Sequence, residues 1–303
     1  MRIIITGGSG LIGSDLSKLL KKDHDVTLID IKESKEKDCN FKFGNIENLE
    51  EVIKLVKNCD VVIHLAAALG VVNTEMNPIK TLDVNMLGTK NVLEACRINK
   101  IKKIIYSSSS EIYGEPLKLP IEESDRIIPI TTYGVSKMTA EEYIKSYARI
   151  HGIRYTIFRM FNVYGDEQDT QWVVPEFVSK AVKNEDITIH EDGRQIRAFC
   201  YVSDVSNAFS YALEKGDNEI FNIGNNSEPI SIKELALKII ALANSQSSIK
   251  FVSFDKSDRN RTEIIKRIPD IQKARKILGY EPTISLTEGI KRLIQKNRSN
   301  GSL

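Results

Sequence analysis

Tyr133 and Lys137 are the two residues whose types and spacing point most directly to chemistry. They stand four positions apart at the start of a segment, 133–151, whose apolar residues predict a helix, so their side chains share one face. A phenol has an ordinary pKa of about 10 and is a poor base at neutral pH. Because an ammonium group one turn away stabilises the phenolate, the pair predicts a base that takes a proton from a hydroxyl group.

Three glycines follow the first apolar run of the chain and predict a nucleotide site. Gly7, Gly10 and Gly13 lie between an expected buried strand at 2–6 and an expected helix at 11–22. Gly7 permits a tight turn, Gly10 lets the backbone approach a pyrophosphate, and Gly13 lets the helix pack closely on the strand. The first N–H groups of the helix and its positive dipole end then face the phosphates. In this context the motif is typical of dinucleotide-binding proteins.

Asp30 ends the next expected strand and indicates which dinucleotide is bound. A carboxylate at this place accepts hydrogen bonds from the adenosine ribose and repels a 2′-phosphate, which favours NAD over NADP. Lys32 lies close by and weakens that preference. The positive charge of an oxidised nicotinamide would further lower the pKa of Tyr133. Tyr133 could then take the proton of a hydroxyl group while the carbon that carries this hydroxyl gives its hydride to the nicotinamide.

The elements that must hold these residues alternate between short apolar runs and amphipathic helices. Continuous Val/Ile runs separated by helices predict parallel strands covered on both faces, which is a doubly wound α/β (Rossmann) sheet. The strands are expected at 2–6, 26–30, 61–65, 103–107 and 155–159, and the helices at 11–22, 48–57, 78–99 and 133–151.

The pattern loosens after residue 161, which predicts a second, smaller lobe. Residues 1–165 are expected to form the NAD-binding domain, with 197–222 returning to it. Residues 166–196 and 223–297 are expected to form an α/β substrate-binding lobe, with helices near 174–183, 231–244, 270–278 and 286–296 and short strands between them. The polar tail at 298–303 is expected to be disordered.

Composition sets the remaining bounds. The chain has 303 residues and a net charge of +2. This charge is smaller than the strong positive charge expected of a protein that binds nucleic acid or an anionic membrane surface. No stretch approaches the roughly 20 apolar residues of a membrane span. The four cysteines match no zinc spacing, and no metal site is expected. A reducing cytoplasm is the expected location.

Several segments together resemble the extended short-chain dehydrogenase/reductases that act on nucleotide sugars. The glycine spacing, the stretch His64-Leu65-Ala66-Ala67 after a strand, and Asn85 within Asp83-Val84-Asn85-Met86-Leu87-Gly88-Thr89 are similar to that family's motifs. Gly44-Asn45-Ile46 resembles the adenine-contacting segment, although the family usually has Asp where this chain has Asn45. The resemblance implies bound NAD, held by Gly7, Gly10, Leu11, Ile12, Gly13, Asp30, Asn45, Ile46, Leu65, Ala66, Ala67, Asn85, Ser107, Tyr133 and Lys137.

The same resemblance assigns the catalytic group around a serine cluster, 107–110. Counting back from Tyr113-Gly114 places Ser109 on the family's catalytic Ser/Thr, beside Tyr133 and Lys137. Glu111 matches the acidic position of the 4,6-dehydratases and nucleotide-glucuronate decarboxylases, where a carboxylate acts at carbon 5 or assists loss of carbon dioxide.

Four residues are expected to bind a nucleoside-diphosphate sugar: Ser109, Asn162, Arg197 and Arg261. Ser109 would hold the reacting sugar oxygen, Asn162 would bond the diphosphate or the sugar, and Arg197 would pair with the diphosphate, since a guanidinium grips phosphate bidentately. Arg261 lies where the family has an Arg-Pro-Gly segment, but this chain reads Asn260-Arg261-Thr262.

The expected function is an NAD-dependent nucleotide-sugar 4-epimerase that oxidises carbon 4 and returns the hydride to the other face. A 4,6-dehydratase or a nucleotide-glucuronate decarboxylase is the alternative, supported by Glu111. A regulatory NAD-binding protein without catalysis is a distant third. The family also implies a homodimer built on helices 78–99 and 133–151, with Ile144, Tyr147 and Ile150 as candidate contacts.

Overall fold

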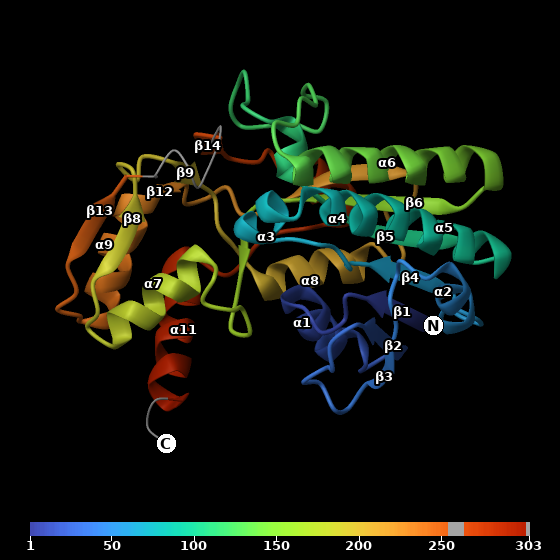
Figure 1. Cartoon of the computed structure of the whole chain (residues 1–303), viewed down its shortest axis with the longest axis horizontal. Coiled ribbons are helices and arrows are strands. Elements are labelled where there is room, and N and C mark those ends of the chain that lie inside the picture. Colours follow the sequence, from blue (N-terminus) through green and yellow to red (C-terminus); the bar gives the residue numbers. More distant parts are fainter. Residues whose placement is uncertain (254–263, 301–303) are drawn as a thin grey trace.

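A seven-stranded parallel sheet forms the larger part of the molecule (Figure 1). The computed structural model describes residues 1–253 and 264–300. The strand order is β11-β6-β5-β4-β1-β2-β3, with the reversal of direction of winding between β1 and β4. Its strands are β1 (Arg2–Thr6), β2 (Asp25–Asp30), β3 (Asn40–Phe43), β4 (Val61–His64), β5 (Lys103–Ser109), β6 (Arg154–Met160) and β11 (Glu219–Ile223).

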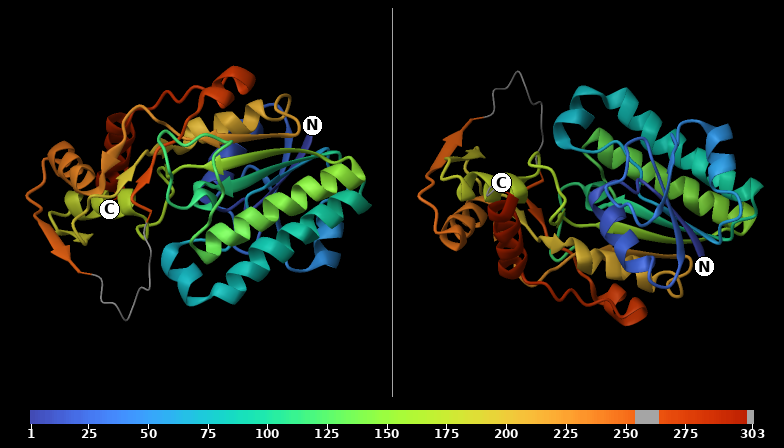
Figure 2. Two further views of the ribbon diagram at one scale, coloured as in Figure 1. Left: turned by 90° about the horizontal axis from the view of Figure 1, so that it is seen from above. Right: turned by 90° about the horizontal axis from the view of Figure 1, so that it is seen from below.

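Helices cover both faces of this sheet, as the apolar runs predict. On one face α1 (Leu11–Leu20) and α8 (Val202–Tyr211) pack with the strands into a single core. On the other face the core is closed by α2 (Leu49–Leu55), α5 (Gly88–Ile98) and α6 (Thr132–His151). Figure 2 shows these two helical layers from opposite sides. The Rossmann-type fold expected from the sequence is confirmed.

The expected helix at 78–99 is interrupted. The structure has α4 (Pro78–Leu82), then a π-helical turn η1 (Asp83–Leu87), and only then α5. A short helix α3 (Val71–Met76) precedes them. The π turn carries Asn85 into the interior, where its side chain is 1% exposed. Such turns are frequent at functional sites.

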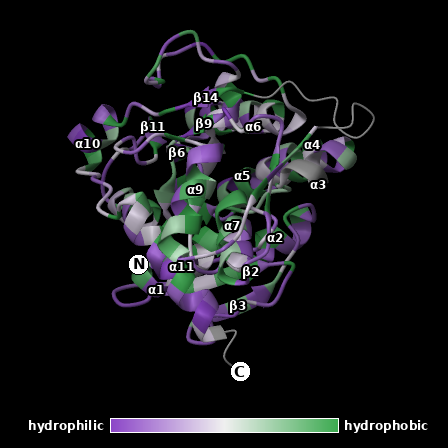
Figure 3. Ribbon diagram, turned by 90° about the vertical axis from the view of Figure 1, so that its left-hand side faces the viewer, coloured by the Kyte–Doolittle hydropathy of each residue, from purple (hydrophilic) through white to green (hydrophobic). Residues whose placement is uncertain are grey.

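A second group of elements forms the lobe at the left of Figure 1. Strands β8 (Ile187–His190) and β13 (Ile249–Val252) pair in parallel, and β12 (Ile230–Ser231), β9 (Ile196–Arg197) and β14 (Lys266–Arg267) form a second small sheet. Helices α7 (Val173–Val182), α9 (Ile232–Ala243) and α11 (Leu286–Asn300) enclose a separate core. Figure 3 shows hydrophobic residues where these helices meet and hydrophilic ones on the outer loops.

Two boundaries differ from those expected. Helix α11 continues to Asn300, so the tail expected to be disordered from 298 is helical for its first three positions. Helix α10 (Gln272–Leu278), expected in the lobe, packs instead against the edge strand β11 and joins the core of the sheet domain through Ala274 and Leu278. The chain thus returns to the sheet a second time before it enters α11.

The remaining short elements lie between the two parts. A 3₁₀ turn η2 (Ser110–Tyr113) follows β5, and β7 (Val163–Tyr164) pairs with β10 (Cys200–Tyr201) where the chain crosses to the lobe. Within the described residues, no helix combines the length and the hydropathy needed to cross a membrane.

Candidate active site

The glycine turn between β1 and α1 has the geometry of a phosphate cradle. Gly7 adopts φ +72°, and a Cβ there would lie 2.6 Å from the Ala66 nitrogen. A Cβ on Gly13 would lie 2.5 Å from the Gly7 carbonyl oxygen. Gly10 is the N-cap of α1 and has no side chain to cap the helix, so Leu11, Ile12 and Gly13 begin a helix whose N-terminal N–H groups remain for a ligand. The cradle fits a dinucleotide pyrophosphate.

Asp30 lies at the end of β2, next to this turn. Its carboxylate accepts hydrogen bonds from the backbone N–H groups of Ser9 (3.0 Å) and Lys32 (3.0 Å). These bonds fix the carboxylate beside the glycine turn, where an adenosine ribose of a dinucleotide would lie. The expected role of Asp30 therefore stays a prediction, with a geometry that suits it.

The other residues expected to bind the cofactor fall into two groups. Asn45 is exposed and its side chain accepts from the Glu47 N–H, whereas Ile46 is 5% exposed and packs in the core, so only its backbone can face a ligand. Leu65, Ala66 and Ala67 follow β4 beside Gly7 and are half-buried.

Asn85 ties the π turn to the catalytic helix. Its amide donates to the Ala68 carbonyl (3.1 Å) and to the Ser136 hydroxyl (2.9 Å), and its oxygen accepts from the Ala68 N–H (2.8 Å). Ser136 in turn donates to the carbonyl of Tyr133 (2.7 Å). Asn85 thus fixes the first turn of α6, consistent with the steadying role expected for it.

Tyr133, Lys137 and Ser109 come together at the carboxyl end of β5. Thr131 caps α6 by accepting from the Gly134 N–H (2.9 Å), and Gly134 is so close to η2 that a Cβ there would lie 2.8 Å from the Glu111 carbonyl oxygen. A hydrogen bond from Ser109 lowers the pKa of Tyr133. Lys137 donates to the Ser107 carbonyl (2.7 Å).

The pKa of Tyr133 differs from the sequence-based expectation. Desolvation raises the pKa of its phenol well above the ordinary value, and the Glu111 carboxylate raises it further, while Ser109 and Arg267 lower it. Burial lowers the pKa of Lys137 to about 7, opposed by Glu141. The groups around Tyr133 therefore hold the pKa of its phenol above the ordinary value, and a positive charge beside it, such as that of an oxidised nicotinamide, would lower that pKa.

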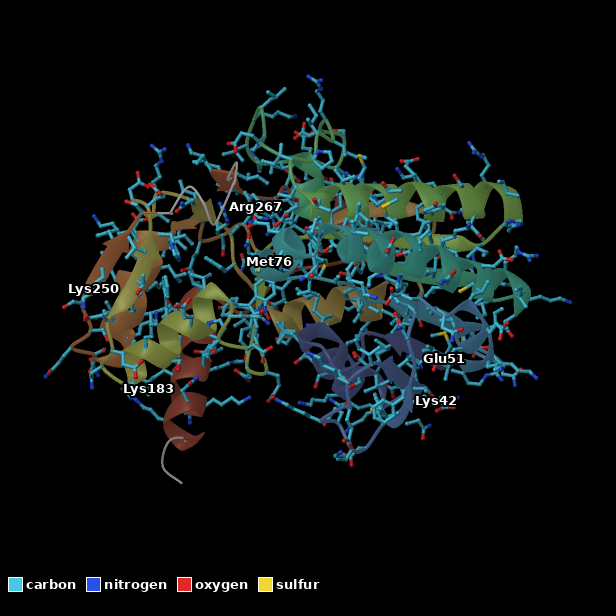
Figure 4. The ribbon with its side chains drawn as sticks, in the orientation of Figure 1. Lys42, Glu51, Met76, Lys183, Lys250 and Arg267 are labelled. Carbon is cyan, nitrogen blue, oxygen red and sulfur yellow. The ribbon has the colours of Figure 1, made fainter. Side chains whose placement is uncertain are left out.

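Glu111 is not a solvent-facing residue. Its side chain is 17% exposed, accepts a hydrogen bond from the Thr131 hydroxyl (2.9 Å), and pairs with Arg267 Nη1 (3.3 Å). Glu111 raises the pKa of the Tyr133 phenol and Arg267 lowers it, as expected for charged groups that lie close to Tyr133. Arg267 lies on β14 at the junction of the lobe and the sheet domain (Figure 4).

The sequence analysis did not identify Arg267. It stands 156 positions from Glu111, and no local pattern marks it. Its Nε is buried and has no hydrogen-bond partner among the described residues. An orphaned guanidinium nitrogen near Tyr133 fits an anionic ligand group.

The expected substrate residues have different outcomes. Asn162 follows β6 with φ +29°, and its Oδ1 is buried without a partner in the described part of the chain, which suits a ligand contact. Arg197 is 5% exposed, donates to the Ile196 and Ile265 carbonyls, and is the Cα partner of Arg267 across β9 and β14. Arg261 lies outside the described residues.

A second feature missed from the sequence is a buried ion pair behind the site. Arg159 and Glu141 are 2% and 1% exposed and form two hydrogen bonds, and Ser108 donates to Glu141 (2.6 Å). Glu141 follows Lys137 by four positions on α6, so helical spacing alone would have placed it on the same face.

A nucleotide cradle on a parallel sheet, joined to a serine, a tyrosine and a lysine, defines a dehydrogenase-type active site. Residues 3–224 match the model of the NAD dependent epimerase/dehydratase family, and the chain belongs to that family. It is an NAD-dependent enzyme, which sets aside the non-catalytic alternative.

Three similar proteins illustrate the range of that family. A protein of Methanocaldococcus jannaschii named "Putative UDP-glucose 4-epimerase" is 41% identical over 98% of this chain and 99% of its own length. A UDP-N-acetyl-alpha-D-glucosaminuronate decarboxylase of Bacillus cytotoxicus is 37% identical over 97% of each chain. The structure of Thermotoga maritima UDP-glucose 4-epimerase with UDP-glucose superposes with a TM-score of 0.92 at 32% identity, covering 99% of each chain.

Proposed function

We propose that this enzyme oxidises carbon 4 of a nucleoside-diphosphate sugar acid and then releases its carboxylate as carbon dioxide. The observation that carries the proposal is the Glu111–Arg267 pair beside Tyr133. The proton and hydride transfers of a 4-epimerase acting on a neutral sugar do not require a partly buried carboxylate and arginine at this place. A sugar carboxylate would give the Arg267 guanidinium the anionic partner that its orphaned Nε lacks.

The first step uses residues that any member of this class requires. Tyr133 takes the proton of the sugar 4-hydroxyl, and Ser109 holds the same oxygen. The Lys137 ammonium, whose Nζ lies 5.8 Å from the centre of the Tyr133 ring, favours the phenolate. Bound NAD supplies hydride transfer, accepting the hydride of carbon 4 and later returning it. The first product is a 4-ketosugar.

Oxidation at carbon 4 makes the carboxylate labile. The carboxyl carbon is then β to the ketone, so its bond to carbon 5 breaks with the electron pair passing to the ketone oxygen, and carbon dioxide leaves. Tyr133, now protonated, hydrogen-bonds the developing enolate oxygen. A proton from water is added at carbon 5 and replaces the lost carbon dioxide. When the hydride returns to carbon 4, Tyr133 gives its proton back to the 4-oxygen, which restores the 4-hydroxyl and the phenolate. Arg267 orients the carboxylate, and Glu111 fixes Arg267.

The 4-epimerase expected from the sequence is the second candidate. The likeness to the Methanocaldococcus protein and to the Thermotoga structure favours it. The likeness to the Bacillus decarboxylase supports the first candidate over a similar share of the chain. A 4,6-dehydratase has no observation of its own beyond Glu111.

The test is to incubate the enzyme with UDP-glucuronate and, separately, with UDP-glucose, and to read the products by mass. Decarboxylation lowers the mass of the UDP-glucuronate product by one carbon dioxide, and epimerisation leaves the mass unchanged. Glu111→Gln is expected to lower release of carbon dioxide by about a hundredfold, whereas the exposed Glu122→Gln is a matched control that leaves it unchanged. Tyr133→Phe is expected to abolish both reactions. Epimerised UDP-glucose, with no carbon dioxide from UDP-glucuronate, would overturn the proposal.

A further inference from the structure

Lys137 is a buried cation without a carboxylate partner. Its side chain is 2% exposed, and its Nζ donates to one carbonyl oxygen, that of Ser107, at 2.7 Å. Within the described part of the chain it forms no ion pair. Burial lowers the pKa of Lys137 to about 7, so at neutral pH its charge is only narrowly maintained. Catalysis nevertheless depends on that charge, because the ammonium stabilises the Tyr133 phenolate.

The ring of Tyr106 lies beside the Lys137 ammonium and attracts it in place of a carboxylate. The Lys137 Nζ lies 4.7 Å from the centre of the Tyr106 ring and 5.8 Å from that of Tyr133. A cation within about 6 Å of a ring centre and over its face is attracted by the electrons of that face, and more strongly when water is excluded. Tyr106 is 1% exposed, so this attraction is not screened by solvent.

We infer that Tyr106 is a positioning residue for catalysis, whose ring face keeps Lys137 charged and directed towards the Ser107 carbonyl. Tyr106 sits on β5, one residue before Ser107, so strand β5 supplies both the ring and the carbonyl. The centre of the ring also lies 5.5 Å from that of the His64 ring, which the Thr6 and Thr89 hydroxyls hold in place. The inference rests on the Tyr133–Lys137 step and not on the fate of the sugar.

The charged and titratable groups around Lys137 can be named from each element that packs on it. Its own helix, α6, carries Tyr133 and Glu141, and Glu141 is bound by Arg159 of β6. Strand β4 carries His64, whose burial lowers its pKa to about 3 and keeps it neutral. On the π turn, the uncharged Asn85 donates to Ser136 of the same helix. The 3₁₀ turn η2, which also packs on α6, carries Glu111, and Glu111 is paired with Arg267.

The direction of the effect follows from this set. Glu141 opposes the effect of burial on Lys137. Removing the Tyr106 ring would take away a second favourable interaction of the ammonium form. The pKa of Lys137 would therefore fall further, and its side chain would stay protonated only at lower pH.

The first experiment measures the lysine directly. The NAD-loaded enzyme is labelled with ¹³C at lysine Cε and titrated by NMR, where a buried lysine with a lowered pKa stands apart from surface lysines. Tyr106→Leu is expected to lower its midpoint by about one pH unit, corresponding to about 1.4 kcal/mol. Tyr106→Phe keeps the ring and is expected to titrate as the parent does. No substrate is needed, so this result is independent of the proposed reaction.

The second experiment covers the case in which Tyr106→Leu fails to fold. Phenylalanine and its pentafluoro analogue are incorporated at position 106, because fluorine withdraws electrons from the ring face while nearly preserving its shape. The pH profile of nicotinamide reduction is then recorded at 340 nm in a single turnover with UDP-glucuronate. The alkaline limb is expected to move to lower pH with the fluorinated ring, at unchanged thermal unfolding.

The outcomes separate the two proposals. Equal lysine midpoints in the Phe, pentafluoro-Phe and Leu variants would overturn the role of Tyr106, whatever the product. Lysine midpoints that shift as expected, without carbon dioxide release from UDP-glucuronate, would leave the role of Tyr106 standing and contradict the proposed function.

Discussion

Glu141→Gln isolates the energetic role of the buried ion pair behind the active site. The substitution keeps the size of the side chain and removes its charge, leaving the Arg159 guanidinium buried with only the Tyr113 hydroxyl (2.9 Å) and the Glu123 carbonyl (3.0 Å) as other acceptors. Breaking one partner of a buried pair costs about 3–5 kcal/mol, because the remaining charge is uncompensated. Ser108 also loses the carboxylate that accepts its hydroxyl.

The matched control is Glu288→Gln on α11. Glu288 pairs with Arg292 at 3.1 Å, but these side chains are 51% and 43% exposed. An exposed pair of this kind contributes about 0–1 kcal/mol. Urea unfolding followed by circular dichroism, at one fixed NAD concentration, compares the two variants with the parent.

The expected result is a loss of about 3–5 kcal/mol for Glu141→Gln and less than about 1 kcal/mol for Glu288→Gln. The double substitution Glu141→Leu with Arg159→Met removes both charges and is expected to recover most of the loss, since no lone charge remains. A Glu141→Gln variant no less stable than Glu288→Gln would refute the reasoning.

Three further predictions concern the cofactor, the assembly and pH. Denatured enzyme is expected to release NAD, because the cofactor is regenerated in each turnover; release of NADP alone, identified by chromatography, would contradict the role of Asp30. We expect a homodimer by sedimentation, dissociated by Ile150→Glu, since Ile150 is 67% exposed on α6, whereas Ile144, another of the three candidate contacts, is 1% exposed within its own core. Burial lowers the pKa of His64 to about 3, so between about pH 6.5 and 3 the unfolded chain binds a proton at this residue that the folded chain does not. The free energy of unfolding is therefore expected to fall as the pH drops through this range. In urea titrations at a series of pH values, His64→Gln should reduce this dependence on pH, whereas His151→Gln, at an exposed position, should not.

Local sequence determines the sheet domain well. Strand β1 was predicted at its observed bounds, because a run of apolar residues directly before a glycine turn has few other solutions. Strand β3 was missed, since Asn40–Phe43 lies at the sheet edge with mostly exposed side chains and shows no buried face. The π turn at 83–87 was also missed, because one extra residue in a helical turn leaves the apolar pattern nearly unchanged.

The site divides in the same way. Tyr133 and Lys137 were predicted from spacing along one helix, and the glycine turn from three positions in one loop. Arg267 could not be predicted in this way, because β14 brings it beside Arg197 and against Glu111 only in the folded lobe. Contacts between residues this far apart depend on tertiary structure, which periodicity does not report.

The same difference between local motifs and distant contacts separates the 4-epimerase expected from the sequence from the decarboxylase proposed here. The proton and hydride chemistry depends on residues before 138, all of which are held by the sheet and its helices. The proposed fate of the ketosugar depends on Arg267, which comes from the lobe. Under the proposed function, a lobe that presents an arginine to Glu111 would favour loss of a carboxylate from the intermediate, and a lobe without it would favour return of the hydride. Members of one family can therefore share the first step and differ in product, because the outcome is determined by the part of the chain that local motifs describe least.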